Sequence, residues 1–191
     1  MCREDYNYPP WINVLHYHLG DVEDEGARSA IRVAHINYIM SLCTFGLNIF
    51  SMLVLAAGGI KWKGVHMIYA IFNFIIYGIV GMYSFYNGYK GLATQNARMT
   101  TNFIGLQSLF LVFMFAASIA SGANYNGWTN VAIASEAKEK VRGFWVGWTY
   151  FESTLWTVDY LVGGFALYKV IKCRKDGGRT SGGGLLRNIG I

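Results

Sequence analysis

The stretch GFWVGWTYFESTLWTVDYLVGGFALYKVI, residues 143–171, decides the fold of this chain, and Lys172-Cys173-Arg174-Lys175 follow it directly. About 20 helical residues, each rising 1.5 Å, cross the hydrocarbon of a bilayer, so the stretch can span one. Its eleven Leu, Ile, Val and Phe residues each favour insertion by roughly 0.3–0.6 kcal/mol. Glu152 and Asp159 each oppose it by about 2.5–3.5 kcal/mol, so the two contributions nearly cancel. We therefore predict a span that inserts together with other helices and turns both acids toward them.

The composition of the chain points to lipid. Of its 191 residues, 53% are hydrophobic and only 14% are charged, whereas a soluble domain usually carries about 25% charged residues. Much of the net charge of +5 lies after residue 171, beside a membrane exit. This placement favours contact with anionic lipid headgroups. No basic helix or aromatic-basic platform lies outside the apolar runs, so no nucleic-acid partner is expected.

Three further apolar runs complete an all-α, polytopic fold with a bundle of four transmembrane helices. No proline interrupts the four predicted spans, which cover residues 36–60, 65–87, 102–122 and 143–171. The short link at 59–64 predicts an antiparallel hairpin of the first two spans. Residues 36–171 thus form the membrane domain. Residues 172–191 form a basic, Gly-rich tail in which 177–184 is typical of a flexible linker.

Residues 1–35 precede the first span and are polar. No early apolar run follows the first five residues, so no cleaved secretory signal is expected. Tyr6-Asn7-Tyr8-Pro9-Pro10-Trp11 is predicted to be extended, because proline restricts itself and the residue before it. Its aromatic side chains suit either an anchor at the level of the lipid headgroups or a plain surface loop. From about Asp24, which can pair with Arg28, we predict an amphipathic helix that lies at the interface before entering the first span.

The orientation follows from the basic residues. Cytoplasmic flanks of membrane spans are enriched in Lys and Arg, and the two ends of this chain carry Arg28, Arg32, Lys172, Arg174, Lys175, Arg179 and Arg187. An even number of spans places both ends on one side. We therefore expect both termini in the cytosol, although Lys61, Lys63, Lys138, Lys140 and Arg142 oppose this assignment.

Two acids inside the last span are its main chemical feature. Glu152 and Asp159 are seven residues apart, nearly two helical turns, and share a face with Trp156. The other spans offer the amides Asn48, Asn73 and Gln107. A polar seam through the bundle, or contact with a partner, would satisfy these groups. The alternative is a proton or cation path. We favour packing, because the interior of the predicted spans contains no Lys, Arg or His partner and no helix broken by Gly or Pro.

The sequence shows no pattern of an enzyme. It contains no nucleophile–base pair, no phosphate-binding Gly loop and no metal-ligand spacing, so neither catalysis nor a cofactor nor a metal is expected. His16 and His18, near the acids at 21–25, are interpreted as solvated imidazoles of a loop. Cys173, beside the membrane and among basic residues, is a candidate for palmitoylation, and an unmodified thiol fits equally well.

Four short motifs, in this order and spacing, resemble those of the secretory carrier-associated membrane proteins. They are Asn7-Tyr8-Pro9-Pro10-Trp11, Leu47-Asn48-Ile49-Phe50, Asn126-Gly127-Trp128 and Tyr168-Lys169-Val170. The similarity covers about residues 7–175. It implies a non-enzymatic, four-span protein of Golgi, endosomal and plasma-membrane carriers that acts in vesicle trafficking, with both ends cytosolic.

The chain departs from that family at two places. Residues 82–89 lack the Trp, Arg and Pro of the Cys-Trp-Tyr-Arg-Pro-type segment tied to membrane fusion, and Asn-Pro-Phe repeats are absent. Contacts with partners or lipid are expected through Tyr83, Tyr86, Tyr89, Lys172, Arg174 and Lys175. The partners would be other membrane proteins in a homo- or hetero-oligomer. An accessory structural subunit of a larger membrane complex is the alternative, and an ion or proton carrier that uses Glu152 and Asp159 is less favoured.

Overall fold

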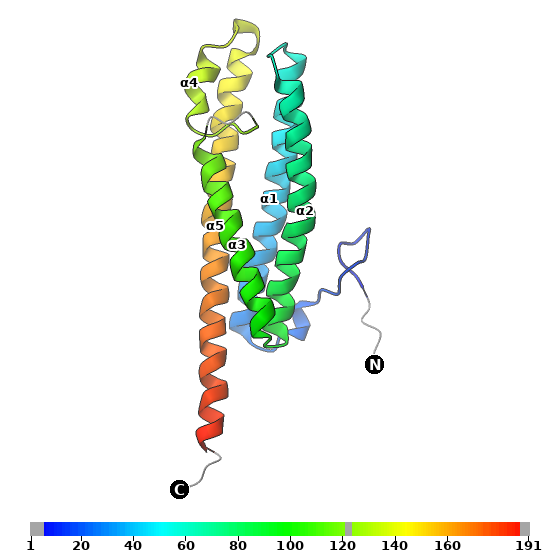
Figure 1. The fold of residues 1–191 in the computed structure, drawn as a ribbon, viewed down its shortest axis with the longest axis vertical. Coiled ribbons are helices and arrows are strands. Elements are labelled where there is room, and N and C mark those ends of the chain that lie inside the picture. Colours follow the sequence, from blue (N-terminus) through cyan, green and yellow to red (C-terminus); the bar gives the residue numbers. More distant parts are fainter. Residues whose placement is uncertain (1–5, 121–123, 188–191) are drawn as a thin grey trace.

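The computed structural model describes residues 6–120 and 124–187, with side chains through residue 175. The end of the predicted third span at 121–122 and the side chains of Arg179 and Arg187 lie outside this description. Four long helices dominate, as Figure 1 shows. The elements in chain order are η1 (Leu19–Asp21), α1 (Glu25–Ala57), α2 (Lys63–Ala93), α3 (Ala97–Ile119), α4 (Asn130–Ser135) and α5 (Glu139–Arg187). The described residues form no strand, so the all-α prediction is confirmed for them.

The four long helices form an antiparallel bundle. Helix α1 packs against α2 and α5, and α3 packs against the same two helices from the other side. The described N-terminal segment and the end of α5 lie at the same end of the bundle (Figure 1). By length and composition, α1, α2 and α3 can each cross a membrane. Helix α5 is not among these candidates, since its acids and its many Trp, Tyr and Thr residues lower its hydropathy, so a fourth span stays a prediction.

Capping side chains and positive φ angles fix where the helices begin. Asp24 caps α1 by accepting a hydrogen bond from the Ala27 amide at 2.5 Å, as expected for a helix that starts near this residue. Asn96 caps α3 by accepting from two amides of its first turn. Between α1 and α2 the chain reverses through Gly59, whose φ of +82° suits glycine. Trp62, the N-cap of α2, also has a positive φ.

Helix α1 is continuous from Glu25 to Ala57, so the helix predicted from about Asp24 runs directly into the first span, and the placement of its first turns at the interface stays a prediction. Residues 88–101, between the predicted second and third spans, are mostly helical, because α2 continues to Ala93 and only residues 94–96 join it to α3. The region 82–89 therefore lies within a helix. Hydropathy marks the part of a helix that crosses lipid, whereas backbone hydrogen bonding continues beyond it.

Two terminal segments also differ from prediction. Helix α5 includes 177–184, which was expected to be a flexible linker. Its glycines each disfavour a helix by about 1 kcal/mol, so propensity does not account for this continuation. The segment around Pro9 is not extended but folds back, with Tyr8 and Leu15 paired as an isolated antiparallel bridge.

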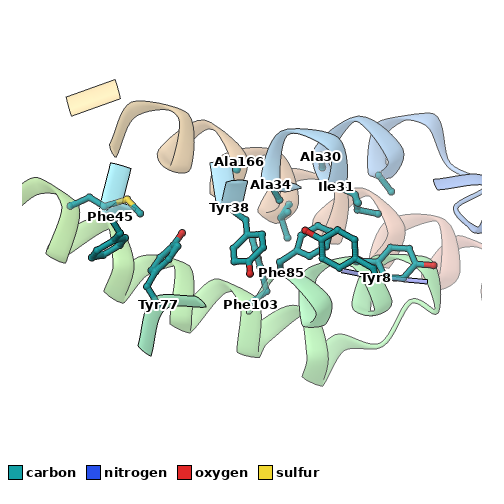
Figure 2. Close-up of a cluster of buried hydrophobic side chains, with 14 of the residues drawn as sticks. Tyr8, Ala30, Ile31, Ala34, Tyr38, Phe45, Tyr77, Phe85, Phe103 and Ala166 are labelled. Carbon is teal, nitrogen blue, oxygen red and sulfur yellow. The ribbon is translucent and has the colours of Figure 1, made fainter. Parts of the chain in front are cut away.

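An aromatic core runs between α1, α2 and α5 (Figure 2). The rings of Tyr38 and Phe85 lie nearly parallel, 6.0 Å apart, and those of Phe45 and Tyr77 stack at 4.8 Å. Phe45 also meets the edge of Trp156 on α5, at 4.9 Å between centroids. These contacts turn one face of α5 toward α1. The same rotation buries both acids of α5.

Candidate functional site

Glu152 lies on α5 with no exposed surface and is surrounded by hydrogen-bond donors. Five N–H groups and one hydroxyl reach its two carboxylate oxygens. They are Asn48 Nδ2 (2.7 Å), Asn126 N (3.3 Å) and Trp156 Nε1 (3.3 Å) at Oε1, and Asn126 Nδ2 (2.7 Å), Trp148 Nε1 (3.0 Å) and Ser51 Oγ (3.1 Å) at Oε2. These donors replace the water that a buried carboxylate has lost.

The donors come from three parts of the chain. Asn48 and Ser51 lie almost one turn apart on α1, so both side chains face α5. Trp148 and Trp156 flank Glu152 at i−4 and i+4 on its own helix. The Ser51 hydroxyl also lies 2.9 Å from the Asn48 carbonyl oxygen, and its single proton serves one acceptor at a time.

Asn126, in the segment between α3 and α4, connects the site to the end of the bundle. It is fully buried, and its Oδ1 accepts from Trp145 Nε1 and from Asn130 Nδ2, both at 3.0 Å. A Cβ on the neighbouring Gly127 would lie 2.7 Å from the Ala117 carbonyl oxygen of α3. Only glycine therefore allows this segment to approach α3 closely enough to place Asn126 beneath Glu152.

Lys63 adds a positive charge at the same end of the bundle. It is the first residue of α2, is 5% exposed, and holds its Nζ 5.0 Å from the centre of the Trp145 ring. Burial lowers the pKa of Lys63, and the negative charge of Glu152 opposes this shift. Lys63 lies just outside the predicted span at 65–87, so the prediction that the interior of the spans holds no basic partner does not cover it. Lys63 was assigned to a link because it precedes the apolar run, whereas the helix begins with it.

Asp159, nearly two turns further along α5, sits in a second polar layer. It is also fully buried, and its Oδ1 accepts from Ser41 Oγ at 3.2 Å. Asn37 donates to the Asp159 carbonyl oxygen at 3.1 Å and accepts from Gln107 at 2.9 Å. In the described part of the chain, Asp159 Oδ2 has no hydrogen-bond partner, since the nearby Thr44 hydroxyl donates to its own helix.

Asn73 joins neither acid directly. Its amide donates to the hydroxyl of Tyr125, whose ring stands perpendicular to that of Trp156 at 5.7 Å. Burial raises the pKa of Tyr125 to about 12, and the negative charge of Glu152 adds to the shift. The structure thus brings Asn48 and Trp156 to Glu152 and Gln107 to the Asp159 layer, while Asn73 is linked to Trp156 through a tyrosine.

A family model, described as the SCAMP family, matches residues 5–177. The chain belongs to the SCAMP family. This confirms the resemblance to the secretory carrier-associated membrane proteins and establishes an integral membrane protein. No curated protein and no solved structure matches the chain.

The tyrosines that the SCAMP resemblance singled out differ in exposure. Tyr83 is 54% exposed and Tyr86 is half-buried, but Tyr89 is only 2% exposed. The Tyr89 hydroxyl donates to Asp21 Oδ2 at 2.7 Å and lies 3.2 Å from the His18 amide that donates to it. Tyr89 is therefore used inside the chain and is not available to a partner in this arrangement.

The basic residues at the end of this SCAMP-family bundle face outward. Lys172, Arg174 and Lys175 are exposed on α5. Cys173, between them, points the other way and packs against the aromatic core near Gly26 of α1. A lipid chain on Cys173 would have to leave from this partly covered position.

His16 is not a solvated imidazole without a partner: its Nε2 lies 2.7 Å from Asp21 Oδ2, and the two side chains form an ion pair when the imidazole is protonated. The Tyr89 hydroxyl, and then His16, hold the pKa of Asp21 below its usual value. Among the described residues of this SCAMP-family chain, no three His, Cys, Asp or Glu side chains gather as metal ligands.

Sequence reasoning missed Ser51, Asn126, Trp145, Trp148 and Lys63 at the Glu152 site. Two signals for them were present. Trp148 and Trp156 stand symmetrically four residues before and after Glu152, and Asn126 belongs to a motif by which the SCAMP family was recognised. Neither signal shows which acid the asparagine meets.

Proposed function

We propose that the protein is a non-enzymatic, four-span component of membrane carriers in post-Golgi and endosomal traffic, with α5 as the fourth span and both termini in the cytosol. Membership of the SCAMP family supports this proposal. In it, the bundle is a scaffold, and function lies in contacts of its surface with lipid and with other membrane proteins.

The observation that carries the proposal is that both acids of α5 are buried in the bundle and bonded to groups of the same chain. Both carboxylates are fully buried and accept hydrogen bonds from α1. The outward face of α5 is apolar and aromatic; its exposed large side chains are Tyr150, Phe151, Val158, Leu161, Phe165 and Tyr168. Packing on α1 thus removes the cost of the two acids, which nearly cancels the apolar gain when this helix inserts alone.

The surface offers contacts at the end of the bundle where the described N-terminal segment lies. Tyr83 is exposed near the end of α2, and Lys172, Arg174 and Lys175 are exposed where α5 leaves the bundle. A basic cluster beside a membrane exit attracts anionic headgroups by about 1 kcal/mol for each residue. Recruitment of partners at this end would then depend on anionic lipid and weaken with salt.

Location and topology test the proposal together. The sequence contains no Asn-x-Ser/Thr sequon, so inserted sequons report the side of the membrane without background. A flexible insertion between α4 and α5 should be glycosylated, whereas insertions ahead of residue 6 or after residue 187 should not. A tagged chain should co-purify with endosomal and post-Golgi carriers. A glycan at either terminus, or exclusive residence in an energy-transducing membrane, contradicts the proposal.

One observation supports a second candidate, an ion or proton carrier. Asp159 Oδ2 is buried without a hydrogen-bond partner among the described residues, as expected for a site that binds a cation or proton. Flux driven by pH or potential in liposomes, compared between the wild type and Asp159→Asn, decides it. Equal flux removes the carrier. Co-purification of other chains at fixed stoichiometry would instead support an accessory subunit of a larger complex.

A further inference from the structure

Residues 6–17 form a hairpin with a defined tip. Tyr8 and Leu15 exchange both backbone hydrogen bonds, at 2.9 and 2.8 Å. Asn7 and Tyr17 exchange side-chain-to-backbone bonds at 3.0 and 2.8 Å. The amides of residues 12 and 13 close the turn on the Pro9 carbonyl oxygen at 3.0 and 2.8 Å. The tip, residues 9–14, is therefore held in one shape from its base.

The base of this hairpin is fixed to two helices of the bundle. The Tyr8 hydroxyl lies 3.0 Å from His35 Nε2 on α1. The rings of Tyr8 and Tyr17 lie 6.0 and 5.1 Å from that of Phe85 on α2, and Figure 2 shows Tyr8 against Phe85 at one end of the core. The tip thus keeps a set position relative to the spans.

The tip is apolar, uncharged and exposed. Trp11 is 92% exposed, Ile12 69% and Val14 44%. No Asp, Glu, Lys or Arg occurs from residue 6 to residue 15. Packing within the chain explains the base but not these three side chains. Without charge, the tip can enter a low-dielectric region at little electrostatic cost.

The hairpin lies at the edge of the lipid-facing belt of the bundle. On α1, Ile36 follows His35 directly and is the first exposed large apolar residue of that helix. On α2, Phe85 comes two residues after Tyr83, the last one. From Val65 to Tyr83 the exposed apolar side chains of α2 cover about 27 Å at 1.5 Å per residue, close to the hydrocarbon thickness of about 30 Å.

The direction in which the tip points also agrees with a position at the edge of the lipid-facing belt. In Figure 1 the dark-blue hairpin turns back along the bundle, and its tip stays within the length of α2 instead of reaching beyond the end of the bundle. A tip that served only as a surface loop in water would point away from the apolar belt.

We infer that residues 9–14 are a lipid-binding tip that inserts into the headgroup–acyl boundary of the leaflet on the side of the described N-terminal segment. Trp11 is the anchor, since its indole is apolar in body and can donate one hydrogen bond at the headgroup level. Ile12 and Val14 extend the apolar contact. The inserted tip widens the footprint of the protein in one leaflet only. This inference holds for any membrane that the protein occupies.

Spin labels on the full-length protein in phosphatidylcholine–phosphatidylserine vesicles test the inference. After the native cysteines are replaced by serine, single cysteines are placed at Ile12, Glu23 and Phe72. Glu23 is an exposed position on the same N-terminal segment, and Phe72 is 58% exposed in the apolar belt of α2. The ratio of collisions with oxygen to collisions with a water-soluble nickel chelate should be several-fold higher at 12 than at 23, and should approach the value at 72.

A matched pair of substitutions shows whether Trp11 anchors the tip. With the label at 12, Trp11→Glu should lower the collision ratio to that of position 23, whereas Trp11→Phe should leave it near the wild-type value. A ratio at 12 equal to that at 23 with Trp11 intact overturns the inference. So does a label that is immobile and shielded from both reagents, because the tip is then covered by protein.

Discussion

Replacing Glu152 by glutamine should destabilise the bundle although the side chain keeps its shape. Glutamine replaces one carboxylate oxygen with an NH₂ group, which cannot accept a hydrogen bond. Its best orientation puts the NH₂ at the Oε2 position, where Ser51 can rotate to accept, but Asn126 Nδ2 and Trp148 Nε1 still point at it. Two bonds to a charged group are lost, at about 1.5–3 kcal/mol each, so we expect a loss of about 3–6 kcal/mol in free energy of unfolding.

Asp159→Asn is the matched control for this substitution. Asp159 Oδ1 accepts from Ser41, whereas Oδ2 has no hydrogen-bond partner among the described residues, and the nearby Thr44 hydroxyl donates to the Met40 carbonyl oxygen. The asparagine can therefore keep the Ser41 bond and place its NH₂ where no donor opposes it. The cost should be about 1 kcal/mol, the difference between a charged and a neutral acceptor for one bond. The expected losses in free energy of unfolding for these two isosteric changes on the same helix face thus differ by several-fold.

Unfolding by SDS in mixed micelles, followed by tryptophan fluorescence, measures both variants. Trp148 and Trp156 donate to Glu152, so their emission reports on the site itself. Glu152→Gln with wild-type stability, or with a smaller loss than Asp159→Asn, would refute the account of Glu152 as a carboxylate held by protein donors.

Three further predictions follow from the same geometry. Gly163→Ala should cost about 1–3 kcal/mol by overpacking, because its Cβ would lie 2.9 Å from Gln107 Nε2, whereas Gly164→Ala, with open space, should not destabilise; thermal melts in detergent compare the two. Asn126→Asp should lower the melting temperature more than Asn126→Ala, since it turns an acceptor toward Glu152. Asp21 has a lowered pKa, so its contribution to docking of the N-terminal segment is present above about pH 4 and is lost as pH falls further. Hydrogen exchange of residues 16–22 should rise only in that acidic range, and Asp21→Asn should remove the dependence.

Several features of the fold were predictable because they depend on local sequence. Runs of apolar residues identified α1, α2 and α3, since lipid demands a continuous apolar helix of about 20 residues. Asp24 marked the start of α1, because an N-cap needs only a side chain and the amides of the next turn. The seven-residue spacing of Glu152 and Asp159 placed them on one helical face.

The ends of the helices were less predictable. The helix α2 continues beyond its apolar run to Ala93, and the turn to α3 closes where Gly91 approaches Thr100, with an added Cβ only 2.7 Å from the Thr100 amide nitrogen. Such a close approach depends on two helices at once. For the same reason Tyr89, expected at the surface, is buried beneath the N-terminal segment. Its hydroxyl accepts a hydrogen bond from the amide of His18, which lies 71 positions earlier in the sequence.

The sequence alone determined that the last long helix carries two acids on one face, and that lipid would not accept them outside the bundle. Only the tertiary structure decided how each acid is accommodated. Glu152 accepts hydrogen bonds from Asn48, 104 positions away, and from Asn126, 26 positions away. Asp159 accepts one from Ser41, 118 positions away, and its other oxygen has no hydrogen-bond partner among the described residues. Hydropathy and spacing describe one helix at a time, but a buried charge is satisfied by groups that only the packing of several helices brings together.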